Sequence, residues 1–426
     1  MRIGFMVVVL LLAAVSWQVI EGQSNVQSAV FEKRQPLPMD LSFERGQART
    51  MVNTLREAMH MNILMQNDIL DQAAQNHAEY LVANKEFAHE EIRGHKNFTG
   101  MKPLDRTLHV GYNSLQISEN LSTGNANAKS SIDNLFSAIY HRFGFLDPNI
   151  DEMGVGVDQD PKNSLNSAFV YVMGNSELNR LCLSAEFRGS GKYVYGVCEN
   201  RKYRIRESTF QNAMNLKKQY NPKIIVYPYD GQSNIPVAFY NETPDPLPQH
   251  KVSGFPISVE FNDYYFDNVE VRSFKLYKSG HVEIKNVLLM NEQSDPNLKF
   301  NAKQFALFPL ERLEFNTEYS VVLTYAVDRK EGELRWSFRT TAPKEELYTI
   351  VEKEEKVTMK RGESYWVYFQ PLNSQDIITR LTFPSGIDIE FVDNSTFKLT
   401  VMSKELKAFD VVTDHRTLHV RVRNSY

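Results

Sequence analysis

Four pieces of sequence between Ala73 and Val157 decide the fold: HAEYLVANKEFAHEE (residues 77–91), GMKPLDRTLHVGY (100–112), ISENLSTG (117–124) and NLFSAIYHRFGFLDPNIDEMGVGV (134–157). They place His89, Glu119 and His141 on separate segments that a compact α/β domain can bring together. Two imidazoles and a carboxylate can hold a divalent metal such as Zn²⁺, and both groups also serve as general bases. Ordinary surface and packing roles remain the alternative, because spacing alone does not show convergence.

Helical periodicity surrounds these pieces. The spacing predicts helices with buried stripes at Ala48, Met51, Val52, Leu55, Ala58 and Met59, and at Leu70, Ala73, Ala74, His77, Ala78 and Leu81. We interpret His77 as a hydrogen-bonded core histidine, because it lies in an apolar stripe. A third helix is predicted to begin near Ser130 or Ser131, with Ile132, Leu135, Phe136 and Ile139 on its core side and Asn134, Ser137 and His141 facing the expected cleft.

The N-terminus is typical of an export signal. Arg2 supplies a positive charge, Phe5 to Val15 an apolar core, and small residues near Gly22 a cleavage point. The core is shorter than the roughly 20 residues of a membrane span. We therefore expect a secreted or periplasmic protein with no transmembrane span after signal removal. An uncleaved N-terminal anchor is the alternative.

The chain contains two cysteines, Cys182 and Cys198. An oxidising compartment favours a disulfide between them, and the turn residues Gly189 to Gly191 predict that the bond staples a hairpin. A metal site is the weaker interpretation, since the spacing does not match a CxxC motif. The net charge of −4 shows no basic footprint for nucleic acid.

Several of the marked residues together resemble the CAP superfamily of cysteine-rich secretory proteins, antigen 5 and pathogenesis-related proteins, also called SCP-like, and especially its bacterial branch. The markers are HA at 77–78, FAH at 87–89, P-x-D-R at 103–106, GY at 111–112, SEN at 118–120, HR at 141–142 and GVG at 154–156. The resemblance implies an α-β-α sandwich with a central cleft that contains His89, Glu119 and His141. Eukaryotic members usually carry a second glutamate on the helix before the last histidine, and the matching position here is Ser137.

Four further residues are expected to support this cleft: Asp105 and Arg106 as a local ion pair, together with Ser137 and Arg142. The chain is long enough for several domains. The fold class is α+β, with a CAP-type sandwich followed by all-β domains of immunoglobulin-like (Ig-like) type. The predicted divisions are a signal peptide (1–22), a linker (23–45), a CAP domain (46–180), a disulfide hairpin with a helical extension (181–227), an Ig-like β-sandwich (228–343) and a small C-terminal β-domain (344–426).

The leading hypothesis for function is a secreted CAP protein that binds a ligand or a divalent metal in its cleft, with β-modules for attachment or partner binding. Lipid, cell-wall material or a protein are the expected partners, in keeping with what the resemblance implies. The family fold does not by itself indicate an enzyme. A metal-assisted hydrolase using His89, Glu119 and His141, and a structural adhesin with a vestigial cleft, are the alternatives.

Overall fold

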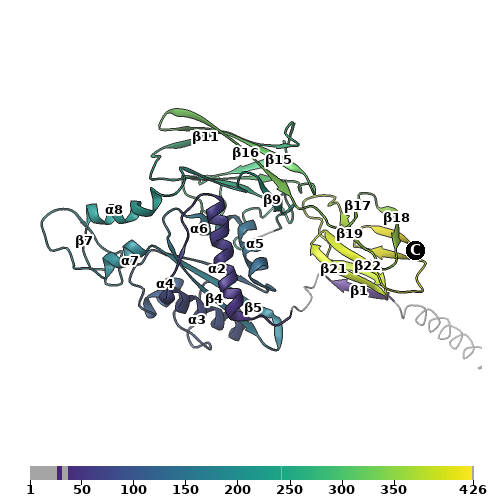
Figure 1. Cartoon of the computed structure of the whole chain (residues 1–426), viewed down its shortest axis with the longest axis horizontal. Coiled ribbons are helices and arrows are strands. Elements are labelled where there is room, and N and C mark those ends of the chain that lie inside the picture. Colours follow the sequence, from purple (N-terminus) through teal and green to yellow (C-terminus); the bar gives the residue numbers. More distant parts are fainter. Residues whose placement is uncertain (1–25, 31–36, 241, 425–426) are drawn as a thin grey trace, which may run out of the picture. The chain divides into compact units, whose positions relative to one another are not determined.

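The computed structural model describes residues 26–30, 37–240 and 242–424 (Figure 1). The predicted signal peptide lies outside the described residues. The chain forms two compact units. One unit spans Gln35–Ala342, and the other combines Pro343–Tyr426 with the N-terminal segment that carries strand β1.

The first half of the larger unit is a four-stranded sheet between two layers of helices (Figure 1). The strand order is β2-β4-β5-β3, which leaves β3 at an edge. The strands are β2 (Met65–Gln66), β3 (Ile117–Thr123), β4 (Glu152–Asp160) and β5 (Asn163–Gly174). The helices are α2 (Leu41–Ala58), α3 (Asp68–Asn84), α4 (Pro103–His109), α5 (Ala128–Ser137), α6 (Ile139–Leu146) and α7 (Ser176–Cys182).

Side-chain alternation along β5 separates the two helical layers. Val170 and Val172 pack with Leu70 and other apolar residues of α3. Tyr171 points the opposite way, and its hydroxyl lies 2.8 Å from the Ser131 hydroxyl of α5. The predicted α-β-α sandwich is confirmed by this arrangement.

Two glycines of β4 allow helix α3 to approach the sheet closely. A Cβ atom added at Gly154 would lie 2.0 Å from the backbone carbon of Leu70, and one at Gly156 would lie 2.2 Å from that of Ala74. Real side-chain atoms cannot occupy these positions unless the helix moves. The GVG sequence therefore has a packing reason in this fold.

The single helix predicted from about residue 130 is divided in two. Ala138 has an extended conformation, with φ −75° and ψ 119°, and separates α5 from α6. Ser137 therefore ends one helix and His141 belongs to the next, so the two residues do not share one helical stripe.

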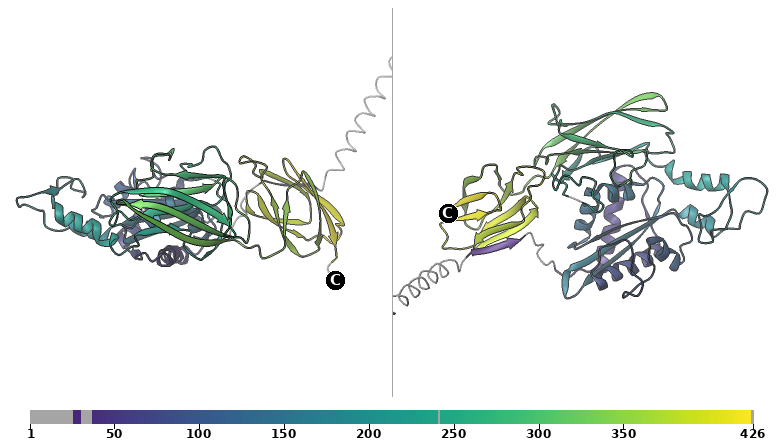
Figure 2. Two further views of the ribbon diagram at one scale, coloured as in Figure 1. Left: turned by 90° about the horizontal axis from the view of Figure 1, so that it is seen from above. Right: turned by 180° about the vertical axis from the view of Figure 1, so that it is seen from behind.

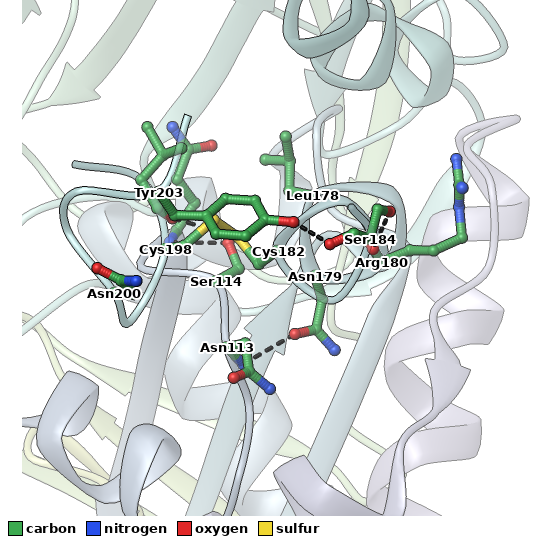
Figure 3. Close-up of a disulfide and its surroundings, with 12 residues drawn as sticks. Asn113, Ser114, Leu178, Asn179, Arg180, Cys182, Ser184, Cys198, Asn200 and Tyr203 are labelled. Atoms are coloured by element: carbon green, nitrogen blue, oxygen red, sulfur yellow. Dashed lines mark hydrogen bonds between the residues drawn. A yellow bond between two sulfur atoms is a disulfide. The ribbon is translucent and has the colours of Figure 1, made fainter. Parts of the chain in front are cut away.

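The predicted disulfide joins Cys182 to Cys198 (Figure 3). The predicted hairpin between the two cysteines is not formed. Cys182 is the last residue of α7, and Cys198 forms an isolated bridge with Ser114. The short strand β6 (Tyr193–Val194) pairs with β7 (Ile205–Arg206), which lies beyond the second cysteine, and helix α8 (Glu207–Lys218) follows.

The second half of the larger unit is a β-sandwich whose sheets can be followed from above in Figure 2. One sheet has the order β13-β14-β10-β8 and the other β12-β11-β15-β16-β9. Phe261 of β10 contacts Tyr325 of β15, with ring centroids 5.1 Å apart, and so joins the two sheets. The strands are β8 (Ile224–Tyr227), β9 (Gln232–Ile235), β10 (Ile257–Phe261), β11 (Val269–Lys278), β12 (Val282–Glu283), β13 (Val287–Met290), β14 (Gln304–Pro309), β15 (Glu318–Val327) and β16 (Lys330–Thr340).

The smaller unit is also all β, with a core that includes Val367, Leu399 and Leu418. Its sheets have the orders β1-β20-β23-β24-β18 and β17-β19-β22-β21. The strands are β1 (Val26–Val30), β17 (Leu347–Ile350), β18 (Glu354–Lys360), β19 (Ser364–Phe369), β20 (Arg380–Pro384), β21 (Ile387–Asp393), β22 (Thr396–Val401), β23 (Ala408–Val412) and β24 (Thr417–Arg423).

The predicted linker over residues 23–45 differs from the structure at two places. Val26–Val30 forms β1 and pairs antiparallel with β20, so this segment is part of a sheet. Helix α2 already begins at Leu41, where Asp40 caps it by accepting hydrogen bonds from the backbone N–H groups of Ser42 and Phe43. Strand β1 and the part of α2 before Ala48 precede the apolar stripe on which the helix prediction depended.

Candidate functional site

Side chains from the two helical layers meet at the edge of the sheet that strand β3 forms. Glu119 points toward α3 and α4, where it meets Arg106. Asn120 points toward α6, where its Nδ2 donates a hydrogen bond of 2.7 Å to the carbonyl of His141. An edge strand has no neighbour beyond it, so side chains from both helical layers can reach each other around it.

His89 and Glu119, two of the three predicted cleft residues, are in direct contact. The Nδ1 atom of His89 lies 2.9 Å from Oε1 of Glu119. The Glu119 side chain is 1% exposed, whereas that of His89 is 45% exposed. The buried carboxylate therefore fixes one nitrogen of a ring whose other side faces solvent.

Arg106 holds this pair from below the surface. Its Nη2 donates to both carboxylate oxygens of Glu119, at 2.9 and 2.8 Å, and to the carbonyl of His89 at 3.0 Å. Asp105 is not its ion-pair partner, in contrast to the prediction. Asp105 instead accepts a hydrogen bond from the backbone N–H of Lys102 at the start of α4.

A second buried pair supports the loop that carries His89. The Nδ1 atom of His77 lies 2.9 Å from Glu91, and its Nε2 atom lies 3.1 Å from the carbonyl of Ala88. Glu91 in turn accepts from the backbone N–H groups of Thr99 and Gly100. His77 is fully buried, which confirms its predicted role as a hydrogen-bonded core histidine.

Opposing effects set the ionisation of Glu119. Burial opposes its negative charge, but the hydrogen bond from His89 and the nearby His77 and Arg106 outweigh that effect and lower the pKa of Glu119. Glu119 is therefore an ionised hydrogen-bond acceptor and a poor proton acceptor near neutral pH.

His141 reaches the same edge from α6. Its ring lies 6.4 Å from that of His89, centroid to centroid, with an interplanar angle of 22°. Its Nδ1 atom lies 3.4 Å from Oε1 of Glu242, at ion-pair distance but without hydrogen-bond geometry. Each histidine thus has a carboxylate beside Nδ1, and neither Nε2 atom is hydrogen bonded to any residue that the structure describes.

Glu242 is the site residue that the sequence does not reveal. Its side chain is 2% exposed, and it accepts hydrogen bonds from the backbone N–H groups of Ile139 and Tyr140 at the start of α6. It lies in the proline-rich segment after β9, which predicts a boundary, and no local pattern marks it. Only the fold places it beside His141.

Two predicted support residues lie outside the cleft. Arg142 is buried among Tyr227 and Phe255, and its Nη1 donates to the carbonyl of Pro256 at 2.7 Å. It therefore fastens α6 to the β-sandwich. The backbone carbonyl of Ser137 accepts a hydrogen bond of 3.4 Å from Arg142. Residue 137 is where eukaryotic family members usually carry a glutamate, and in this chain Glu242 brings a carboxylate to His141 instead.

These contacts limit which of the predicted metal ligands are free to bind a cation. Within residues 26–30, 37–240 and 242–424, no three His, Cys, Asp or Glu side chains are arranged to hold a metal ion. Arg106 and His89 occupy the Glu119 carboxylate. The two imidazoles are the predicted ligands whose Nε2 atoms have no hydrogen-bond partner among the described residues, and each has a carboxylate near Nδ1.

A family comparison matches the segment that contains His89, Glu119 and His141. Residues 49–175 match the model of the cysteine-rich secretory protein family, CAP. No curated protein matches the chain. Within the described residues, none of the helices combines the length and the apolar character needed to cross a membrane.

Several solved structures are similar to part of the chain. An outer surface protein of Borrelia burgdorferi is 18% identical with a TM-score of 0.28, covering 32% of this chain and 95% of that protein. An extracellular SCP-domain protein of Bacillus anthracis is 16% identical with a TM-score of 0.28, covering 33% of this chain and 44% of that one. A cysteine-rich secretory protein of Staphylococcus aureus is 20% identical with a TM-score of 0.25, covering 33% and 40%. The chain thus spans less than half the length of the latter two proteins.

Proposed function

We propose, from the premise that residues 49–175 form a CAP domain, that this is an exported binding protein whose cleft holds a divalent cation such as Zn²⁺. The Nε2 atoms of His89 and His141 would be the protein ligands. A bound cation supplies coordination positions for oxygen or nitrogen donors of a further ligand.

The observation that carries this proposal is that each imidazole has a buried carboxylate near Nδ1, hydrogen bonded at His89 and at ion-pair distance at His141. Glu119 lies 2.9 Å from Nδ1 of His89, and Glu242 lies 3.4 Å from Nδ1 of His141. Histidines that bind metals usually donate the other ring N–H to a carboxylate or carbonyl, which fixes the tautomer and orients the ring. Glu119 and Glu242 then act as positioning residues.

Export is supported by two features. The first 22 residues have the composition of a signal peptide. Cys182 and Cys198 form a disulfide, a bond that persists mainly in oxidising compartments. We propose an extracellular or periplasmic location on these grounds.

The β-sandwich after the CAP domain and the smaller β unit are proposed to provide attachment or partner binding. Lipid, cell-wall material and protein are the candidate partner classes. The structural adhesin differs from this proposal because it assigns all binding to the β-modules and none to the histidine cleft.

The metal-assisted hydrolase has less support from the geometry. That hypothesis needs Glu119 as a base or orienting group. The Arg106 contacts and the lowered pKa of Glu119 make it a weak base, although it can still orient His89. We therefore place binding ahead of turnover.

Isothermal titration with ZnCl₂ at neutral pH tests the proposal. We expect saturable binding by the unaltered protein and by a control with His281→Ala and His415→Ala, which removes two exposed imidazoles elsewhere. A variant with His89→Ala and His141→Ala should lose this binding. Equal binding by both double variants, or no binding by the unaltered protein, would reject the proposal.

A further inference from the structure

A cavity of about 740 Å³ lies beside α6, where the CAP domain meets the β-sandwich. Ser118, Tyr140 and Asp147 line it from the CAP side, and Glu260 and Gln304 line it from the β side. We call it the junction cavity. Its volume is within the range of roughly 300–1,000 Å³ that small-molecule sites occupy. None of the three predicted cleft residues lines it.

Two buried polar atoms at this cavity lack partners within the described part of the chain. Glu260 is 7% exposed, and its Oε1 atom accepts a hydrogen bond of 3.2 Å from Gln304, but its Oε2 atom has no partner. The Ser118 hydroxyl has none either. A buried polar group without a partner is unfavourable, so a ligand that hydrogen bonds to these atoms would relieve that cost.

Glu260 is suited to donate as well as accept. Burial raises the pKa of Glu260 well above its usual value, and the nearby charge of Asp147 raises it further. A protonated carboxyl group carries one O–H donor. An oxygen-rich, uncharged ligand can satisfy such a group, because a hydroxyl both donates and accepts.

The charges around the cavity do not select an ion. Lysines and acids line it together, and two of the lysines are already engaged. Lys218 pairs with Asp263 at 2.8 Å, and Lys303 donates to the backbone carbonyl of Asp267 at 2.6 Å. The lysine and carboxyl side chains of the lining are Lys218, Lys299 and Lys303 together with Asp147, Glu260, Asp263 and Glu292, so acids exceed bases by one.

Aromatic rings form part of the wall. Phe300 packs edge-on against Tyr140 and Phe143, with centroids 5.8 and 5.1 Å apart. A sugar ring has hydroxyl groups at its edge and apolar C–H groups on its faces, which match this mixture of polar atoms and rings. We propose that the junction cavity is a binding site for an uncharged saccharide.

A glycan microarray probed with the full-length protein tests this proposal. Ala302 is exposed and lines the cavity, so Ala302→Trp should fill it from the rim. We expect the unaltered protein to retain at least one uncharged glycan, and Ala302→Trp to retain it at least tenfold less. Ala185→Trp, at an exposed alanine outside the cavity lining, is the matched control and should bind normally.

Circular dichroism establishes that each variant is folded. If Ala302→Trp does not fold, Lys299→Trp at another exposed lining position takes its place and should give the same loss. No retained glycan, or equal retention by the filled and control variants, would overturn the proposal. Binding that salt abolishes would identify an ionic ligand and would also overturn it.

The saccharide site is independent of the proposed cation site. The variant with His89→Ala and His141→Ala should keep its glycan binding while it loses zinc binding. If the histidine double variant lost glycan binding and Ala302→Trp kept it, the saccharide would bind in the histidine cleft. That result would contradict this proposal. Zinc and glycan binding can therefore fail separately.

Discussion

Arg106 is the residue that fixes the acidic side of the cleft. It and Glu119 are each 1% exposed and form a two-bond ion pair. Removal of one partner leaves the other charge buried and unpaired. The packing of the cleft therefore depends on this arginine as much as on the histidines.

We expect Arg106→Ala to lower the free energy of unfolding by about 3–5 kcal/mol, because Glu119 would lose its buried partner. Chemical denaturation measures this change. Arg335→Ala is the control, since Arg335 and Glu333 form an exposed pair whose loss should cost less than about 1 kcal/mol. Similar losses in the two variants would contradict the assigned role of Arg106.

Glu260 gives stability a pH dependence of a particular sign. The pKa of Glu260 in the folded state is raised above 4.5, its ordinary value. At a pH between the unfolded-state and folded-state pKa values, the folded protein therefore binds a proton that the unfolded protein releases. Stability therefore falls as the pH rises through this window. We expect Glu260→Gln to raise the Tm relative to the unaltered protein at about pH 8 and to change it little at about pH 4. Equal shifts at both pH values in thermal denaturation would argue against a raised pKa.

At the scale of elements, close packing of α3 on β4 explains why the sheet carries glycines. Gly154 and Gly156 leave no room for a Cβ atom next to the helix backbone. Leu70 and Ala74 are the helix residues that come nearest. The sequence marks these glycines only as part of a family pattern, and the structure supplies their physical reason.

We expect Gly154→Ala to destabilise the protein by about 1–3 kcal/mol or more, because the added methyl group forces α3 away from the sheet. Gly46→Ala is the matched change inside helix α2, where no atom lies within 4 Å of the added Cβ. That variant should gain roughly 0.5–1 kcal/mol from better helix propensity. Urea denaturation should therefore show a lower free energy of unfolding for Gly154→Ala and a higher one for Gly46→Ala. An unchanged free energy of unfolding in Gly154→Ala would contradict the prediction.

Helices with regularly spaced apolar residues were predictable from sequence, but the break between α5 and α6 was not. Helices α2 and α3 follow the apolar stripes that were predicted from Ala48 and from Leu70. Directly after the break at Ala138, the first backbone N–H groups of α6 donate to Glu242, which lies outside residues 49–175. Such a distant partner leaves no trace in a local window of sequence.

At the scale of the larger unit, the β-sandwich contributes to the CAP domain in two ways. Arg142 of α6 donates hydrogen bonds to Pro256 and to Ser258 of β10. Glu242 brings a carboxylate to His141. Sequence motifs found His89, Glu119 and His141, but Glu242 joins them only through the folded arrangement of two modules.

We expect Glu242→Gln to weaken zinc binding about 10–100-fold, as is usual when a metal-orienting carboxylate is removed. The two hydrogen bonds from α6 end on different carboxylate oxygens, whereas a glutamine side chain has one oxygen. The variant therefore keeps one acceptor for α6 and loses the other, and we expect the fold to persist. Calorimetric titration measures the affinity, and circular dichroism tests the fold. Glu292→Gln, at an exposed position outside the histidine cleft, should leave the zinc affinity unchanged. An unchanged affinity in Glu242→Gln would remove Glu242 from the site.

The most direct measurement is a crystal structure of the protein soaked in zinc, with anomalous data collected on both sides of the zinc absorption edge. We predict one strong zinc peak bonded to Nε2 of His89 and Nε2 of His141, with Glu119 and Glu242 remaining at the two Nδ1 atoms. A peak bonded to the Glu119 carboxylate, or a cleft with no peak while zinc occupies other sites, would contradict the account.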